Sequence, residues 1–232
     1  MKKIFTLLLL VSIFSCGDDA DKLTVKGTVK GLKKGTIYLK KVQDTLLVTM
    51  DSIIINGSSE FKLQSAITEP EMFYLYLNKN TKEDDRISFF ADKGLTEINT
   101  TLKNFSYDAK IKGSKQHATL EEYLAMIAKF NNKNLDLTKE LFEASKVNDT
   151  VKLKQTELAL NSFTKRKYLY TANFAVSNSD SEVAPYLALS EIYDANIKYL
   201  DTINTVLTPK VKASKYGKQL NQYIIDIKKS EQ

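Results

Sequence analysis

The single cysteine, Cys16, follows a short apolar segment near the start of the chain, and this placement selects one chemistry for its thiol. Lys2 and Lys3 precede the apolar residues 4–14, and the small residue Ser15 stands directly before the cysteine. A charged start, a short apolar run and a small residue before cysteine form the export signal of bacterial lipoproteins. We therefore predict residues 1–15 as a signal peptide and Cys16 as the lipidation site, with ordinary secretion and cleavage nearby as the alternative.

Acidic residues directly follow the predicted lipidation site. Asp18 and Asp19 lie within residues 16–21, which we interpret as a soluble tether. An acidic run at this place also resembles the signal that sorts some Bacteroidetes lipoproteins to the cell surface, so a sorting signal at Asp18 and Asp19 is the alternative. In either case we expect a cell-envelope protein that is lipid-anchored to a membrane. The outer membrane is favoured, on its periplasmic or its surface face.

The lone histidine, His117, stands four residues before Glu121, a spacing that places both side chains on one face of a helix. Zinc takes three or four protein ligands, and the neighbouring sequence supplies no others. We therefore predict no metal site and interpret His117 as a surface or helix-start residue. Ser-x-x-Lys, a hydrolase signature, starts at Ser59 and at Ser162, but its companion motifs are absent. We attribute both matches to chance and predict no catalytic residues.

Two further groups of side chains have the composition of binding sites. Residues 83–86 include three acids, which could do acid–base work on a sugar if they faced a cleft, but they follow a polar stretch typical of a solvated loop. Tyrosines occur in pairs at Tyr74 and Tyr76 and at Tyr168 and Tyr170. Packing between the two halves of the chain is the simpler explanation for them. If they serve a ligand, we expect it in a groove between those halves.

Composition narrows the remaining function classes. The 232 residues carry a net charge of +6, with lysines and acids mixed along the chain, whereas nucleic-acid binding favours clustered basic residues. Lipidation of Cys16 leaves no thiol for a disulfide, for thiol catalysis or for a cysteine–metal site. The glycine-rich loops that bind nucleotide phosphates are absent from the sequence. We therefore predict no cofactor, no nucleic-acid partner and no enzymatic activity.

Alternating apolar and polar residues through about residue 113 predict antiparallel strands with one face in water. Segments 72–77 and 87–91 are more continuously apolar and should form interior strands. Asn56-Gly57, between an isoleucine run and Phe61, predicts a tight hairpin because such turns need positive φ. Roughly eight strands separated by turn residues indicate a β-sandwich domain over residues 22–113.

The second half has the apolar period of helices, which predicts a helical domain over residues 114–232. Thr119-Leu-Glu-Glu122 has capping-box spacing and predicts the start of the first helix. A polar turn and then a serine-rich break separate two further helices, the third with Pro185 in its first turn. Thr208-Pro209 predicts the start of the last helix. The predicted fold class is α+β, an antiparallel β-sandwich followed by an all-helical domain.

Several turn and core segments resemble one known family. They are Gly27-Thr-Val-Lys-Gly31, Gly35-Thr-Ile-Tyr-Leu39, 51–61, 89–94, 111–114, 178–186 and 214–218. These segments are similar to the N-terminal region, a domain of unknown function, of Bacteroidetes thiol–disulfide interchange (thioredoxin-like) lipoproteins. The resemblance spans about residues 22–228 and implies the same fold and an envelope location.

The resemblance does not carry redox activity to this chain. In those proteins the helical region leads into a thioredoxin-like domain with a Trp-Cys-x-x-Cys pair. The sequence given ends at Gln232, has no tryptophan and has no cysteine besides Cys16. We therefore expect a thioredoxin-like domain to act, if at all, as a separate partner.

Together these patterns favour a lipid-anchored envelope protein of non-enzymatic binding or scaffolding type. The alternative is a non-catalytic module of a thiol–disulfide oxidoreductase system, acting with a separate thioredoxin-like envelope protein or derived from a longer redox protein. A last helix well packed around Leu220, Tyr223, Ile224 and Ile227 would favour the first interpretation. The expected partners are the membrane, through the lipid on Cys16, and in the alternative the thioredoxin-like protein.

Overall fold

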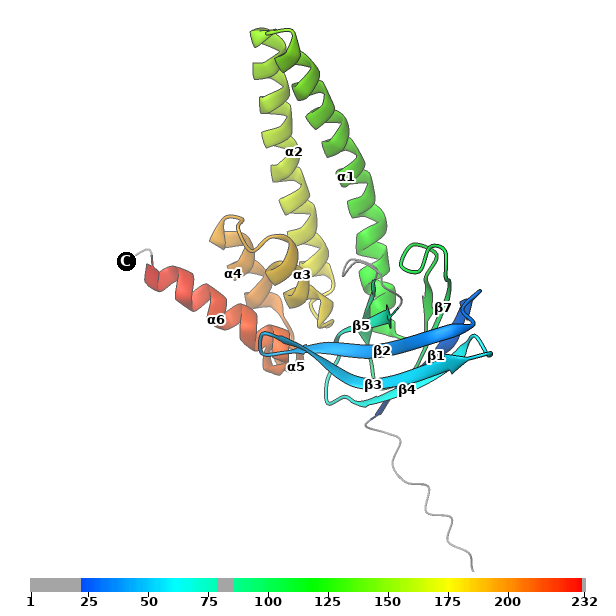
Figure 1. Cartoon of the computed structure of the whole chain (residues 1–232). Coiled ribbons are helices and arrows are strands. Elements are labelled where there is room, and N and C mark those ends of the chain that lie inside the picture. Colours follow the sequence, from blue (N-terminus) through cyan, green and yellow to red (C-terminus); the bar gives the residue numbers. More distant parts are fainter. Residues whose placement is uncertain (1–21, 79–85, 231–232) are drawn as a thin grey trace, which may run out of the picture.

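A computed structural model describes residues 22–78 and 86–230, with eight strands followed by six helices (Figure 1). The strands are β1 (Lys22–Lys30), β2 (Lys34–Gln43), β3 (Leu46–Asn56), β4 (Glu60–Ala66), β5 (Glu71–Asn78), β6 (Arg86–Ala91), β7 (Gly94–Thr101) and β8 (Lys110–Lys112). The helices are α1 (Lys115–Lys146), α2 (Thr150–Ser177), α3 (Val183–Glu191), α4 (Ile197–Val206), α5 (Pro209–Ala213) and α6 (Lys215–Ser230). The predicted α+β class, with strands first and helices after them, is confirmed.

The strands form two four-stranded sheets. The first sheet has the order β4-β1-β7-β8 and the second has the order β3-β2-β5-β6. All pairs are antiparallel except β1 and β7, which run parallel with Leu23 opposite Gly94. Sequence alternation reports which residues share a face but not which way a neighbouring strand runs. The strands were predicted to be antiparallel, and the alternation could not reveal that one pair is parallel.

One hydrophobic core fills the space between the sheets. Leu23 and Val25 from the first sheet and Ile37 and Leu39 from the second are fully buried there. Apolar surface removed from water stabilises a fold by roughly 25 cal/mol per Å². One face of each of these strands packs against the other sheet, and this explains why apolar and polar residues alternate along them.

Strand β5 lies inside its sheet, as predicted, whereas β6, also predicted as an interior strand, is an edge strand. Both strands nevertheless bury side chains on two faces. Phe73 and Phe89 point into the sandwich core. Met72 and Phe90 point the other way, into a second cluster built with helix residues. The outer face of β5 and β6 is therefore the platform on which the helices pack.

The turn at Asn56-Gly57 is not the hairpin that its sequence predicts. Gly57 has the expected positive φ of +99°, but β3 and β4 belong to different sheets. The turn passes the chain from one sheet to the other, and Asp51 on β3 accepts a hydrogen bond of 2.8 Å from the backbone N–H of Gln64 on β4. The tight hairpin lies instead between β2 and β3, where Asp44 has φ +54°.

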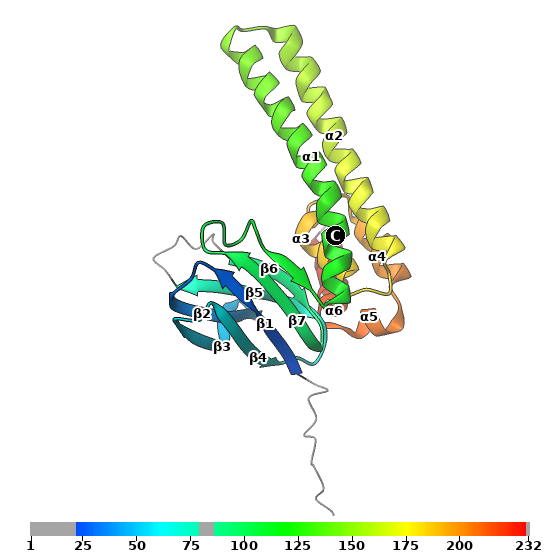
Figure 2. The same ribbon diagram turned by 90° about the vertical axis from the view of Figure 1, so that its right-hand side faces the viewer.

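Helices α1 and α2 form a long antiparallel hairpin, here called the α1–α2 arm, that extends beyond the other helices (Figures 1 and 2). Helix α1 starts at Lys115, because Ser114 is extended and its Oγ accepts a hydrogen bond from the backbone N–H of His117. The predicted start at Thr119 is wrong, since the Thr119 hydroxyl bonds back to the Lys115 carbonyl within the helix.

The four remaining helices pack beside the base of the arm. Pro185 lies in the first turn of α3, as predicted. Thr208-Pro209 starts the short α5 rather than the last helix, and α4 was not predicted at all. Leu220 and Ile224 of α6 are buried in the helical core, as expected of a well-packed last helix, and Tyr223 and Ile227 pack against this core half-buried.

The outer part of the α1–α2 arm exposes apolar side chains. Leu135 and Phe142 of α1 and Val151 and Leu158 of α2 are all exposed. The tip of the arm and the start of β1 lie at opposite ends of the molecule in both views (Figures 1 and 2). Within the described parts of the chain, no helix is both long enough and apolar enough to cross a bilayer.

Candidate binding site

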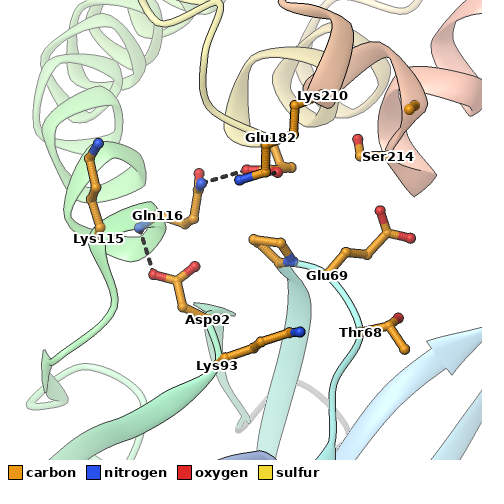
Figure 3. A pocket seen from close by; sticks show the side chains of 11 residues that line it. Thr68, Glu69, Asp92, Lys93, Lys115, Gln116, Glu182, Lys210 and Ser214 are labelled. Atoms are coloured by element: carbon orange, nitrogen blue, oxygen red, sulfur yellow. Dashed lines mark hydrogen bonds and ion pairs between the residues drawn. The ribbon is translucent and has the colours of Figure 1, made fainter. Parts of the chain in front are cut away.

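A polar pocket of about 540 Å³ lies where the sandwich meets the helices (Figure 3). It is lined by Thr68, Glu69, Pro70, Asp92, Lys93, Lys115, Gln116, Glu182, Lys210, Ala213 and Ser214. The β4–β5 loop and the β6–β7 turn form one wall, and the starts of α1, α3 and α6 form the others. This is the groove between the two halves in which we expected any ligand to bind.

Asp92 connects the end of β6 to the start of α1. Its Oδ2 accepts hydrogen bonds from the Ser114 hydroxyl at 3.0 Å and from the backbone N–H of Gln116 at 3.2 Å. The carboxylate thereby satisfies one of the backbone donors that a helix start leaves unpaired, and its charge is favoured by the helix dipole. Its other oxygen, Oδ1, is buried and has no hydrogen-bond donor among the described residues.

Glu182 is a carboxylate that is almost completely removed from solvent, with 1% exposure. Its Oε2 accepts a hydrogen bond of 2.5 Å from the side-chain amide of Gln116, and the Gln116 oxygen accepts one from the Ser181 hydroxyl (Figure 3). The Lys210 ammonium is 3.8 Å from Oε1 and largely in solvent. Hydrogen bonding to Gln116, more than ion pairing, therefore holds the buried charge.

Glu69 closes the third side of the pocket. Its Oε2 accepts a hydrogen bond of 2.7 Å from the backbone N–H of Lys215, the first residue of α6. Ser214 is buried beside it, donates to the Val211 carbonyl and accepts from the Gly217 backbone N–H. The carboxylate thus lies at the start of a second helix.

Two of the three carboxylates share one arrangement. Asp92 and Glu69 bond to the first turns of α1 and α6, whereas the Glu182 side chain makes no cap bond to α3 and accepts from Gln116 instead. A helix start attracts anions, so Asp92 and Glu69 already occupy the positions that an anionic ligand would take at α1 and α6. Carboxylate oxygens accept several hydrogen bonds each. The pocket is therefore best suited to a ligand that offers N–H or O–H donors.

Charged and polar contacts fix the helices to the sheet beside the pocket. Buried Glu71 on β5 forms ion pairs with Lys41 on β2 at 2.6 Å and with Lys215 on α6 at 2.8 Å. The backbone N–H of Met72 donates to the Tyr216 hydroxyl at 3.1 Å. The two contacts with α6 join residues 144 positions apart, so they hold one wall of the pocket against the other.

His117 lies in the first turn of α1 but is not a surface residue, because only 4% of it is exposed. Its Nδ1 accepts a hydrogen bond of 3.3 Å from the backbone N–H of Phe90, and its Nε2 is 3.5 Å from Glu121. Burial lowers the pKa of His117, against the opposing charges of Glu121 and Asp92. No group of three His, Cys, Asp or Glu side chains that could hold a metal occurs within residues 22–78 and 86–230.

One tyrosine of each pair takes part in packing between the halves. Tyr74 and Tyr170 contact the cluster around Met72 and Phe90, whereas Tyr168 packs on the opposite side of α2 and donates to Asp194. Tyr76 accepts a hydrogen bond from Arg86. None of these four residues lines the pocket.

Phe90 is the centre of this aromatic contact. It makes edge contacts with the rings of Tyr186 and Tyr216, whose centroids lie 5.6 and 5.7 Å away. Burial raises the pKa of Tyr186 to about 12, so its phenol stays neutral. An uncharged aromatic cluster of this kind adds packing energy to the joint between sheet and helices.

The remaining predicted features lie apart from the pocket. Ser59 precedes β4, Ser162 lies on the exposed side of α2, and neither lines this pocket. Cys16, Asp18, Asp19 and the acidic residues 83–85 lie outside the described residues. The pocket acids were not predicted, because Gln116 and Glu182 are separated by 66 positions and each occurs in an ordinary helix-start sequence.

Residues 23–120 match the family model of a domain of unknown function, DUF4369. The match runs from β1 to the start of α1, so it includes Asp92, Gln116 and His117 but not Glu182. No curated protein sequence matches the chain significantly. One solved structure, titled pT26-6p, shares 13% identity over 83% of this chain with a TM-score of 0.23. This chain spans 42% of that structure's chain, and a likeness at this score carries no argument.

Proposed function

We propose that this chain is a lipid-anchored cell-envelope protein of non-enzymatic binding type, whose binding site is the pocket between the sandwich and the helices. The observation that carries the proposal is the set of pocket carboxylates, Asp92, Glu69 and Glu182, each fixed by the protein's own hydrogen bonds. Fixed acceptors around a polar cavity lose little entropy when a ligand binds. A small hydroxyl- or amine-bearing molecule, such as an amino sugar or a short peptide, matches them.

Ligand binding can be tested by thermal unfolding of the mature chain carrying Cys16→Ser. Glucosamine, a dipeptide set and neutral polyols are suitable probes, and a bound ligand raises the Tm in proportion to its concentration over Kd. The increase should disappear in Asp92→Asn and Glu182→Gln but persist in Glu60→Gln, which changes an exposed acid far from the pocket. An increase that survives both pocket substitutions would place the site elsewhere.

The lipid anchor has its own test. Cells expressing the full chain are labelled with an alkyne-bearing palmitate analogue and separated into membrane and soluble fractions. We expect label and membrane association for the native chain and neither for Cys16→Ser, because lipid chains supply the membrane affinity. Replacing Asp18 and Asp19 with Ala should reduce protease accessibility on whole cells if they form a sorting signal, and unchanged accessibility would rule that signal out.

The second candidate is a non-catalytic module that acts with a separate thioredoxin-like envelope protein, as the resemblance to thiol–disulfide interchange lipoproteins implies. The exposed apolar side chains of the α1–α2 arm favour it, since such side chains are common at protein interfaces. The test is to read the coding sequence next to this gene for a Trp-Cys-x-x-Cys protein and to co-express the two, followed by size-exclusion chromatography. Co-elution should be lost in Leu135→Gln/Phe142→Gln, and independent elution of the native chain would exclude the pairing.

A further inference from the structure

The outer face of the first sheet is strongly basic. Side chains alternate along each strand, and those that point away from the core on β4, β1, β7 and β8 include six lysines but two glutamates. The lysines are Lys22, Lys26, Lys30, Lys62, Lys110 and Lys112, all exposed, and the acids are Glu60 and Glu97. In Figure 2, β4, β1 and β7 lie in front of the second sheet and no helix covers them. We call this surface the lysine face.

The register places one pair of lysines directly opposite each other and sets Glu97 between two lysines. Lys62 lies directly opposite Lys26, which pairs in turn with Glu97, and Glu97 lies opposite Lys112. Like charges directly opposite in adjacent strands destabilise a sheet. The Glu97 carboxylate accepts a hydrogen bond from Asn99. Among the described residues, no carboxylate lies within ion-pair distance of Lys26, Lys62, Lys110 or Lys112.

The lysine face begins at the end of the predicted tether. Lys22 is the first residue of β1 and is itself part of the face. The six residues from Cys16 to Asp21 reach at most about 20 Å when fully extended. A lipid on Cys16 would therefore hold this sheet close to the bilayer, whereas the tip of the α1–α2 arm lies at the opposite end of the molecule.

We propose that the lysine face docks on the anionic headgroups of the membrane that holds the lipid, with lysine ammonium groups contacting lipid phosphates. This inference rests on the proposed lipid anchor and adds a second membrane contact to it. Lys26, Lys62, Lys110 and Lys112, which have no described carboxylate within ion-pair distance, are complementary to a surface of fixed negative charge. Each lysine near such a surface contributes about fivefold in partitioning at moderate salt, from about 1 kcal/mol per residue. Docking would orient the protein with its sheet on the membrane and its arm directed away.

The test uses the mature chain with Cys16→Ser, so that no lipid contributes. Sedimentation with large vesicles compares pure phosphatidylcholine with vesicles that contain 30% phosphatidylglycerol, at 50 and 150 mM salt. We expect binding to the anionic vesicles alone, weakened by salt because screening shortens the reach of exposed charges. Lys26→Gln/Lys62→Gln/Lys112→Gln should reduce partitioning on the order of a hundredfold, from about fivefold per lysine.

The matched control is Lys133→Gln/Lys139→Gln/Lys154→Gln, which removes the same charge from exposed positions on the α1–α2 arm. It should bind nearly as the parent does. Equal losses in both triple variants would show a net-charge effect and overturn the proposal, as would binding to neutral vesicles. Binding that appears only after Asp18→Asn/Asp19→Asn would mean that the acidic tether occupies the face, which also overturns it. Failure here leaves the palmitate-labelling result unaffected, so the two proposals fail separately.

Discussion

The lone histidine makes the joint between sheet and helices sensitive to pH. Neutral His117 accepts the Phe90 backbone N–H through Nδ1, and protonation of that nitrogen would remove the acceptor. Burial lowers the pKa of the group below its ordinary value of about 6.5, although Glu121 and Asp92 act in the opposite direction. A group with a lowered folded-state pKa contributes stability above the unfolded-state pKa and loses it as the pH falls toward the folded-state value. The protein should therefore become less stable on mild acidification.

The size of the effect is bounded by a single proton. Between pH 7.5 and pH 5.5 the loss in the free energy of unfolding is at most about 1.4 kcal/mol, reached if the folded state stays unprotonated throughout. Urea unfolding at intervals of half a pH unit measures it. The window isolates this residue, because the chain has one histidine and the carboxyl groups titrate mainly at lower pH.

His117→Asn is the informative variant, since its side-chain oxygen can accept the Phe90 N–H without titrating in this range. We expect its stability to be nearly independent of pH from 7.5 to 5.5. A native chain whose stability stays level or rises on acidification would refute the reasoning, because it would mean that the imidazole is protonated in the folded state without penalty. A pH dependence that persists unchanged in His117→Asn would assign it to other groups.

Two substitutions test how closely the structural elements approach one another. Tyr216→Phe removes the hydroxyl that accepts a β5 backbone N–H, and urea titration should show a free energy of unfolding lowered by about 1–3 kcal/mol. The control is Tyr107→Phe, at a side chain that is 93% exposed, which should change this free energy little. Gly113→Ala should lower the free energy of unfolding by about 1–3 kcal/mol more than Gly57→Ala in the same assay. Both glycines have positive φ, but only at Gly113 would a Cβ lie 2.2 Å from a backbone atom, the Leu95 carbonyl oxygen. Equal costs for the two alanine substitutions would show that the close approach is unimportant.

Local patterns predicted those parts of the fold that depend on neighbouring residues. The alternation in β1 and β4 reflects burial against one core, and the apolar runs of β5 and β6 reflect burial on two sides. Ser114 was missed as a helix cap because Thr119 offers the same side-chain chemistry. What distinguishes them is the extended backbone at Ser114, which sequence spacing does not report.

Contacts between distant segments were beyond prediction from one sequence. Asn56-Gly57 has the residue types of a hairpin, and only the arrangement of two sheets makes it a crossing. The pocket was expected between the halves, but its acids were not identified, since Asp92 and Glu182 gain their surroundings from helix starts that are remote in the chain. The partners of a buried carboxylate are fixed by topology, which periodicity does not encode.

The parallel pairing of β1 with β7 affects the order in which the sandwich can assemble. β1 is the first strand along the chain but an inner strand of its sheet, and its Thr28 bonds Asn99, 71 positions later. When the chain appears in order from its N-terminal end, one edge of β1 therefore stays unpaired until nearly the whole sandwich sequence is available. Such non-local pairing slows folding, and an open strand edge is a template for aggregation in the meantime. Until β7 is available, only chaperones or rapid folding can keep that edge of β1 from pairing with another chain.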